Sequence, residues 1–102
     1  MKVEMTFNDV AVRNNGYTLG DIYYTIQSAF AKRGITCSSE SEVLTFEGTG
    51  SERDFANIGN LLLDLLKADW FIKCASSCVL FDDDDTEEDV LSQSTEIRKM
   101  LA

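Results

Sequence analysis

Seven of the eight residues between positions 82 and 89 are acidic, and side chains of this type in one short run can hold cations. Because the run carries seven of the chain's 18 acidic residues, removing it would change the net charge from −9 to −2. A local negative patch attracts cationic partners and repels nucleic-acid phosphates. We therefore expect a basic protein partner and no direct binding to nucleic acid. The candidate partner-binding residues are Asp82, Asp83, Asp84, Asp85, Glu87, Glu88 and Asp89.

The acidic run also contains two patterns that belong to sites of other kinds. The spacing Asp82-x-Asp84-x-Thr86 resembles the motif of haloacid-dehalogenase-type phosphotransferases, which begins a much longer domain than the 16 residues that follow Thr86 here. Read as a calcium loop from Asp82, the run has Glu87 where glycine is required and Gln93 where glutamate is required. The expectation is therefore a solvated acidic segment without a metal site or a cofactor.

The remaining composition argues against an enzyme. The chain has no histidine, which is the commonest general base at neutral pH. Its three cysteines, Cys37, Cys74 and Cys78, have no imidazole to activate them and are expected to be reduced thiols of a cytoplasmic protein. In one strand Cys74 and Cys78 would be too far apart to bridge, whereas in a tight hairpin they could face each other. No stretch reaches the roughly 20 apolar residues of a membrane span.

Apolar spacing and capping signals predict the elements. Alternation over residues 2–7 predicts a half-buried strand, and the change of parity at Val10 and Val12 indicates a bulge or turn at residues 8–9. Thr18 and Asp21 are placed to open a helix over residues 19–33, which Gly34 would close. Residues 35–37 and 42–48 are predicted to pair as a hairpin across a polar turn at residues 38–41.

The second half is predicted to repeat the helix–strand order. A helix is expected to open at Ser51 and cover residues 52–66. Residues 70–81 are interpreted as a long strand broken at residues 75–77; alternatively the helix extends to about Cys74 and only residues 78–81 are strand. A last helix is expected after Thr86. Its apolar side chains would be Val90, Leu91, Ile97, Met100 and Leu101.

This order predicts an α+β fold, namely a ferredoxin-like βαββαβ sandwich with two helices on one face of an antiparallel sheet and an extra C-terminal helix. Residues 1–82 would form the core, and residues 83–102 the acidic segment and helix appended to the same domain. Because this fold hosts many unrelated functions, it predicts no activity by itself, and we infer the function from the acidic run.

We expect a non-catalytic interaction module, for instance a phage-encoded nucleic-acid mimic that inhibits a restriction or CRISPR complex. The alternatives are a structural homo-oligomer and a small-molecule sensor. The sensor would share the layout of ACT domains. Its candidate ligand loop is Asn14, Asn15, Gly16 and Tyr17.

Overall fold

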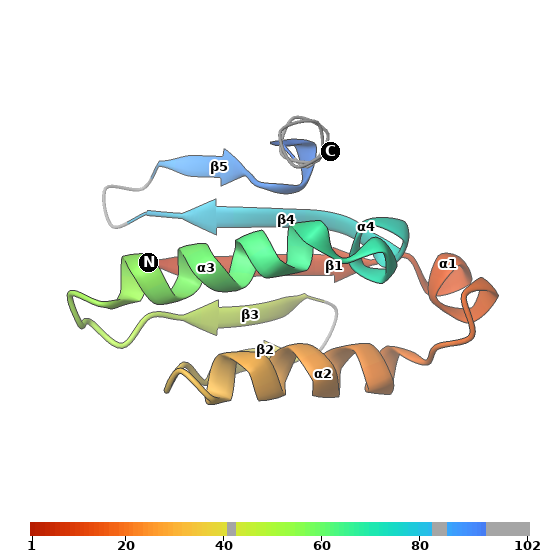
Figure 1. The fold of residues 1–102 in the computed structure, drawn as a ribbon, viewed down its shortest axis with the longest axis horizontal. Coiled ribbons are helices and arrows are strands. Elements are labelled where there is room, and N and C mark those ends of the chain that lie inside the picture. Colours follow the sequence, from red (N-terminus) through yellow and green to blue (C-terminus); the bar gives the residue numbers. More distant parts are fainter. Residues whose placement is uncertain (41–42, 83–85, 94–102) are drawn as a thin grey trace.

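The structure is a computed structural model that describes residues 1–40, 43–82 and 86–93. Within these residues the chain has an α+β fold with one five-stranded antiparallel sheet and four α-helices (Figure 1). The spatial order of the strands is β2-β3-β1-β4-β5. The strands are β1 Lys2–Phe7, β2 Cys37–Glu40, β3 Leu44–Glu47, β4 Ala75–Phe81 and β5 Glu87–Asp89. The helices are α1 Asp9–Asn14, α2 Leu19–Ala31, α3 Asp54–Lys67 and α4 Asp69–Cys74, and a 3₁₀ turn, η1, covers Leu91–Gln93.

The two long helices, α2 and α3, lie on the same side of the sheet (Figure 1). Side chains of the strands alternate, so that one face of β1 presents Val3 and Met5 to the helices. In the antiparallel register Val3 is opposite Phe46, and Met5 is opposite Leu44 and Cys78. All five side chains are fully buried, and they form the sheet side of the core. Ile26 of α2 and Leu62 of α3, both predicted as core residues, are buried on the helix side.

The helix predicted over residues 19–33 is found as α2, which ends two residues earlier than predicted, at Ala31, and the predicted signals at Thr18, Asp21 and Gly34 are used. The hydroxyl of Thr18 accepts a hydrogen bond from the backbone N–H of Asp21, and the Asp21 carboxylate accepts one from the N–H of Thr18. At the other end Gly34 has a φ of 77°. The N–H of Ile35 donates to the carbonyl of Phe30, and both side chains are buried, as in a Schellman motif.

The bulge or turn predicted at residues 8–9 is instead the start of a helix, because α1 begins at Asp9. The side chain of Asn8 accepts a hydrogen bond from the N–H of Ala11, which caps this short helix. The change of parity is therefore a change from the two-residue period of a strand to helical spacing. Val12 faces the core, whereas Val10 is 58% exposed.

The hairpin exists, but its first strand lies later than predicted. Strand β2 covers residues that were assigned to the polar turn, while Ile35 is used as the buried end of the α2 cap. The strand has little apolar character because it lies at the edge of the sheet and pairs only with β3. Gln27 of α2 donates a hydrogen bond to the carboxylate of Glu40 (2.6 Å), which ties this edge to the helix layer.

Helix α3 begins at Asp54, two residues after the start of the predicted range 52–66. The Asp54 carboxylate accepts hydrogen bonds from the hydroxyl of Thr49 (2.7 Å) and the N–H of Gly50 (2.8 Å). Although this carboxylate is partly buried, the bond from Thr49 and the backbone donors around it hold the pKa of Asp54 below its usual value. The loop before α3 is thereby folded around one ionised side chain.

The strand predicted over residues 70–81 is wrong in its first half, where α4 is found. The alternative correctly placed helix as far as Cys74, but the helix is interrupted at Ala68, whose backbone is extended (ψ 121°). Phe71 and Cys74 are spaced for one face of a helix and are both fully buried. Strand β4 then begins directly at Ala75. Cys74 and Cys78 are free thiols.

The helix predicted after Thr86 is wrong over residues 87–89, which form β5. The carbonyl of Thr86 accepts a hydrogen bond from the N–H of Asp82, and the N–H of Val90 donates to the carbonyl of Cys78. These bonds and the buried Val90 side chain hold the acidic residues against β4 despite their low strand propensity. The other apolar residues of the predicted helix, Ile97, Met100 and Leu101, lie outside the described residues.

Candidate partner-binding face

The face of the sheet opposite the helices carries acidic side chains from three strands. Asp89 is opposite Val79, which in turn is opposite Glu4 of β1. In the adjacent row Glu87 is opposite Phe81, and Glu47 of β3 lies in the same row on the other side of β1. Because residues directly opposite each other point to the same face, four carboxylates share this surface. We call Glu4, Glu47, Glu87 and Asp89 the acidic face.

Lys2 is the only basic residue in the five described strands, which together hold six acidic residues. Its ammonium group lies 3.3 Å from the carboxylate of Glu4 and 4.8 Å from the centre of the Phe81 ring. This ion pair is half exposed, so it is worth at most about 1 kcal/mol and offsets one carboxylate of the acidic face.

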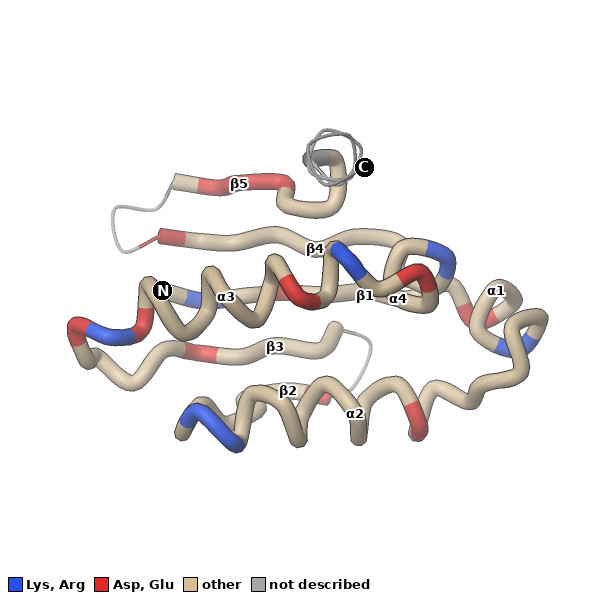
Figure 2. Tube along the Cα trace, viewed as in Figure 1, with Lys and Arg blue, Asp and Glu red and all other residues tan. Residues whose placement is uncertain are grey.

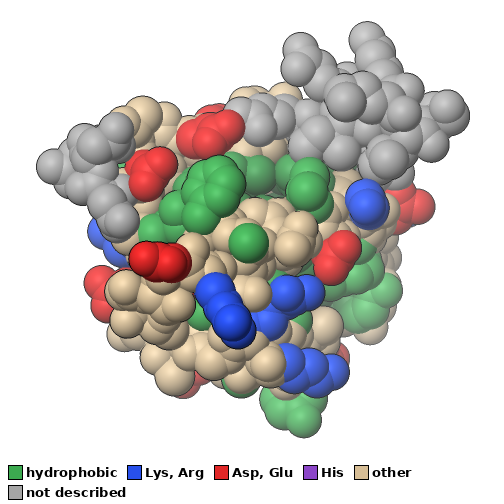
Figure 3. Space-filling view, turned by 60° about the vertical axis from the view of Figure 1, so that its left-hand side comes forward, with side chains coloured by type: hydrophobic (Ala, Val, Ile, Leu, Met, Phe, Trp, Pro, Cys, Tyr) green, Lys and Arg blue, Asp and Glu red, His purple; other side chains and the backbone are tan. Residues whose placement is uncertain are grey.

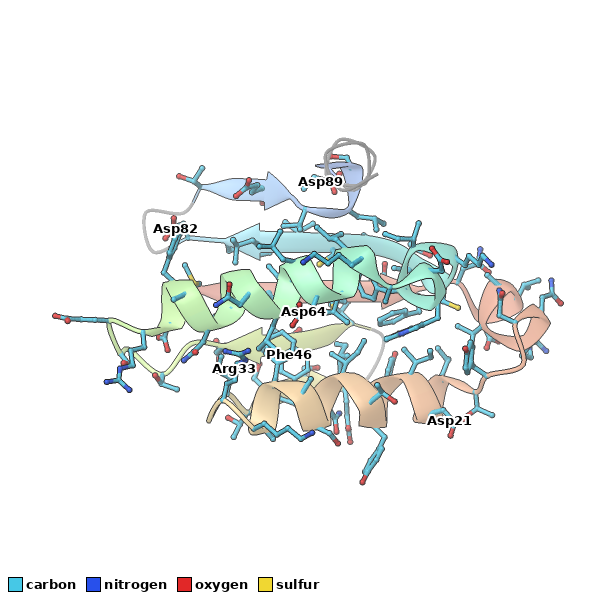
Figure 4. The ribbon with its side chains drawn as sticks, viewed as in Figure 1. Asp21, Arg33, Phe46, Asp64, Asp82 and Asp89 are labelled. Atoms are coloured by element: carbon cyan, nitrogen blue, oxygen red, sulfur yellow. The ribbon has the colours of Figure 1, made fainter. Side chains whose placement is uncertain are left out.

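The predicted acidic run is divided among several places in the fold. Asp82 directly follows β4, and Asp89 lies at the far end of β5 (Figure 4). Figure 2 shows acidic residues along β5 and directly after β4. Within β5, Glu87 and Asp89 join the acidic face, whereas Glu88 points to the helix side and lines a groove beside α3. The run is therefore not one continuous surface. Three of its predicted partner-binding residues, Asp83, Asp84 and Asp85, lie outside the described residues.

Sequence reasoning missed the carboxylates that β1 and β3 contribute. Glu4 alternates with the buried Val3 and Met5, so its position on the outer face could have been found from the strand pattern alone. Its place in the same row as Asp89, with Val79 between them, could not be found, because nothing in the pattern predicted that residues 87–89 would pair with β4. The acidic face is thus assembled by the sheet from residues more than 80 positions apart.

The candidate ligand loop connects α1 to α2, and its polar groups are used largely within the loop. The side-chain amide of Asn15 donates to the carbonyl of Ala11 (2.7 Å), and Gly16 has a φ of 81° that suits the turn. Tyr17 is 40% exposed and borders a cavity of about 160 Å³. Asn14 is the last residue of α1. The other residues that line the cavity are Asp21, Ile22, Thr25 and Trp70.

Two of the three cysteine thiols are buried, and the third forms a hydrogen bond. Cys74 and Cys78 are buried, and burial together with the negative charge of Asp89 raises the pKa of Cys78 to about 12. Such a thiol stays protonated and is a poor nucleophile at neutral pH. Cys37 is half-buried and donates a hydrogen bond to the carbonyl of Ser39. Among the described residues, no three His, Cys, Asp or Glu side chains are grouped as metal ligands would be.

The chain matches no protein-family model, no curated protein and no solved structure. In the ranges that the structure describes, none of the helices has the length and apolar character needed to cross a membrane.

Proposed function

We propose that this protein is a non-catalytic interaction module whose acidic face binds a cationic surface of a partner protein in the cytoplasm. The observation that carries the proposal is the convergence of Glu4, Glu47, Glu87 and Asp89 on the face that the helices leave open. Glu87 and Asp89 are same-face residues of one strand, about 7 Å apart, and Glu4 and Glu47 lie on two other strands, so that each carboxylate can meet its own lysine or arginine. A rigid sheet also orders these charges before binding, which lowers the entropic cost of association.

The position of β5 favours a different protein as the partner over a second copy of the chain. The strand forms one edge of the sheet and consists of Glu87, Glu88 and Asp89. Acidic side chains at an edge oppose pairing with the like-charged edge of another copy. A basic surface would meet attraction at the same place, and this attraction would accelerate the encounter as well as strengthen the complex.

In its specific form, the proposal is an inhibitor of a nucleic-acid-binding complex, such as a restriction or CRISPR system, encoded by a phage. Carboxylates held on a rigid surface would imitate phosphates in the basic groove of such a complex. We also propose that the first four strands and the two long helices are a ferredoxin-like unit to which β5 has been added. The antiparallel order β2-β3-β1-β4, with α2 and α3 on one side, supports this assignment.

The proposal is tested by neutralising β5 and measuring binding to an arginine-rich peptide at low and physiological salt. The variant Glu87→Gln/Asp89→Asn removes two carboxylates of the acidic face and leaves an oxygen on residue 89 to accept the hydrogen bond from the N–H of Ser92. With about 0.2–1 kcal/mol for each exposed ion pair, the affinity should fall roughly 2- to 30-fold at low salt. The loss should shrink as salt screens the charges.

The matched control is Glu52→Gln/Asp64→Asn, which changes the net charge equally at two exposed positions before and within α3. The proposal requires a clearly larger loss for the β5 variant than for this control. Equal losses would mean that the peptide senses only net charge, and the acidic face would then not be a binding site.

A further inference from the structure

Helix α3 has an exposed apolar ridge in addition to the face that it buries in the core. The α3 ridge consists of Phe55, Gly59 and Leu63, which are four positions apart and line an apolar groove of about 350 Å³ together with Leu80 and Val90. Phe55 is 70% exposed and Leu63 is 42% exposed, which is unusual for large apolar residues gathered in one place. Figure 3 shows hydrophobic side chains gathered on this face beside acidic ones.

Gly59, at the centre of the α3 ridge, is not required by the folding of a single chain. Glycine inside a helix destabilises the helix relative to alanine, and its advantage is that it lets another backbone come close. Gly59 does not have the positive φ found at Gly16, Gly34 and Gly50, and a Cβ added to it meets no atom within 4 Å. The surface at Gly59 is therefore suited to the close approach of a helix from a second molecule.

The α3 ridge is complementary to a second copy of itself. Phe55 lies four residues before Gly59, and Leu63 lies four residues after it. A two-fold axis at Gly59 would therefore pair each Phe55 with the partner's Leu63, and the two helices would run antiparallel. Each exposed Phe55 ring would then enter the groove of the other copy, so that the same apolar contact is made twice.

The charges at the two ends of α3 favour the same arrangement. Glu52 lies seven residues before Gly59 and Lys67 lies eight residues after it, and both side chains are exposed. In an antiparallel pair each Glu52 would lie near the partner's Lys67, whereas a parallel pair would bring like charges together at both ends. The ridge therefore offers a second copy both an apolar match and a charge match.

We propose that the chain forms a two-fold symmetric dimer in which the α3 ridges of two copies pack antiparallel across Gly59. The contact leaves the acidic face open, because α3 lies on the other side of the sheet (Figure 1). An interface made by one pair of helices belongs to the small class whose complexes are weak, so half of the chains should be dimeric at a concentration on the order of 100 µM.

Salt separates this dimer from the proposed binding of a cationic partner. Each chain has a net charge of −9, so two copies repel each other at long range, and screening of that repulsion should strengthen the dimer. Binding of the acidic face to a cationic partner should instead weaken with salt. Either property can therefore fail without the other.

Sedimentation equilibrium of wild type and Gly59→Ala tests the dimer. In a single chain the new methyl group meets no atom and favours the helix, but in the dimer the two methyl groups would meet at the axis. The dissociation constant should therefore rise roughly tenfold, while the thermal midpoint of dilute protein should not fall.

The matched control is Gly20→Ala, which makes the same change in α2. There the added Cβ makes only an ordinary contact with the hydroxyl of Thr18 (3.8 Å), so the dissociation constant should not change. A wild type that stays monomeric at about 1 mM would overturn the proposal and leave the groove to a different protein. Equal effects of the two glycine variants would also overturn it.

Disulfide formation tests the direction of the two helices. In a Cys37→Ser background, Glu52→Cys/Lys67→Cys should give a covalent dimer, since the two positions lie about 22 Å apart along one chain and cannot bridge within it. An equimolar mixture of the two single variants should form the mixed disulfide, whereas each single variant alone should link slowly. A single variant that links to itself as fast as the mixture would overturn the antiparallel arrangement. The far-ultraviolet circular dichroism of each variant reports whether the fold is intact.

Discussion

Truncation of Ile26 to alanine should cost about 2–5 kcal/mol of the free energy of unfolding. This side chain is 1% exposed and lies on the inner face of α2. The substitution removes three carbon atoms, which at about 0.8 kcal/mol per buried methylene accounts for roughly 2.4 kcal/mol, and the remaining cavity adds to this loss. For a domain whose total stability is of the order of 5–15 kcal/mol, this is a large fraction.

The assay is urea unfolding followed by circular dichroism, with the fluorescence of Trp70, the chain's single tryptophan, as a second probe. The midpoint should fall by roughly 1 M or more without a change in the slope of the transition. Tyr24→Ala is the matched control, because Tyr24 is on the same helix but 75% exposed, and it should stay within about 0.5 kcal/mol of the wild type. If Ile26→Ala costs less than about 1 kcal/mol, or no more than the control, the inner face of α2 has been assigned incorrectly.

Three further predictions concern the α3 loop and the thiols. Hydrogen bonds lower the pKa of Asp54 in the folded state, so its ionised form stabilises the fold above the ordinary aspartate pKa. This stabilisation is lost as the pH falls through the lowered pKa. The difference in thermal midpoint between wild type and Asp54→Asn should therefore shrink between pH 6 and pH 3. Gly48→Ala should destabilise by about 1 kcal/mol or more in urea titrations, since its new methyl group would lie 2.7 Å from a carboxylate oxygen of Asp54, whereas Gly59→Ala, as control, meets no atom. An aromatic disulfide reagent should modify Cys37 in the native protein and reach Cys78 only on unfolding; rapid modification of all thiols would contradict the packing of β4.

The elements that could be predicted are those whose local signals agree with their tertiary surroundings. Helix α2 has a capping box at Thr18, an apolar stripe and a glycine at position 34, and each of these signals has the predicted role. Strand β1 was equally clear, because the alternation of Val3 and Met5 with polar residues matches a sheet that is buried on one face.

The errors arose where contacts made elsewhere in the chain outweigh local preference. Residues 70–74 are aromatic and suited to a strand, but the burial of Phe71 and Cys74 fixes them as a helix. Residues 87–89 are poor strand formers, yet the free edge of β4 and the buried Val90 hold them in the sheet. Of the candidate site, the charge could be predicted and the arrangement could not, because the acidic face depends on this last pairing.

The central position of β1 has a consequence for how the chain reaches this fold during synthesis. The strand is flanked by β3 and β4, which begin 37 and 68 residues after Phe7. At roughly 5–20 residues per second, a ribosome needs about 2–7 s to supply the first neighbour and about 3–14 s to supply the second. During this time the strand has two open edges and its apolar face has no complete core to join. The complete sheet therefore forms only after β4 has been synthesised, and until then the apolar face of β1 is open to contacts with other chains.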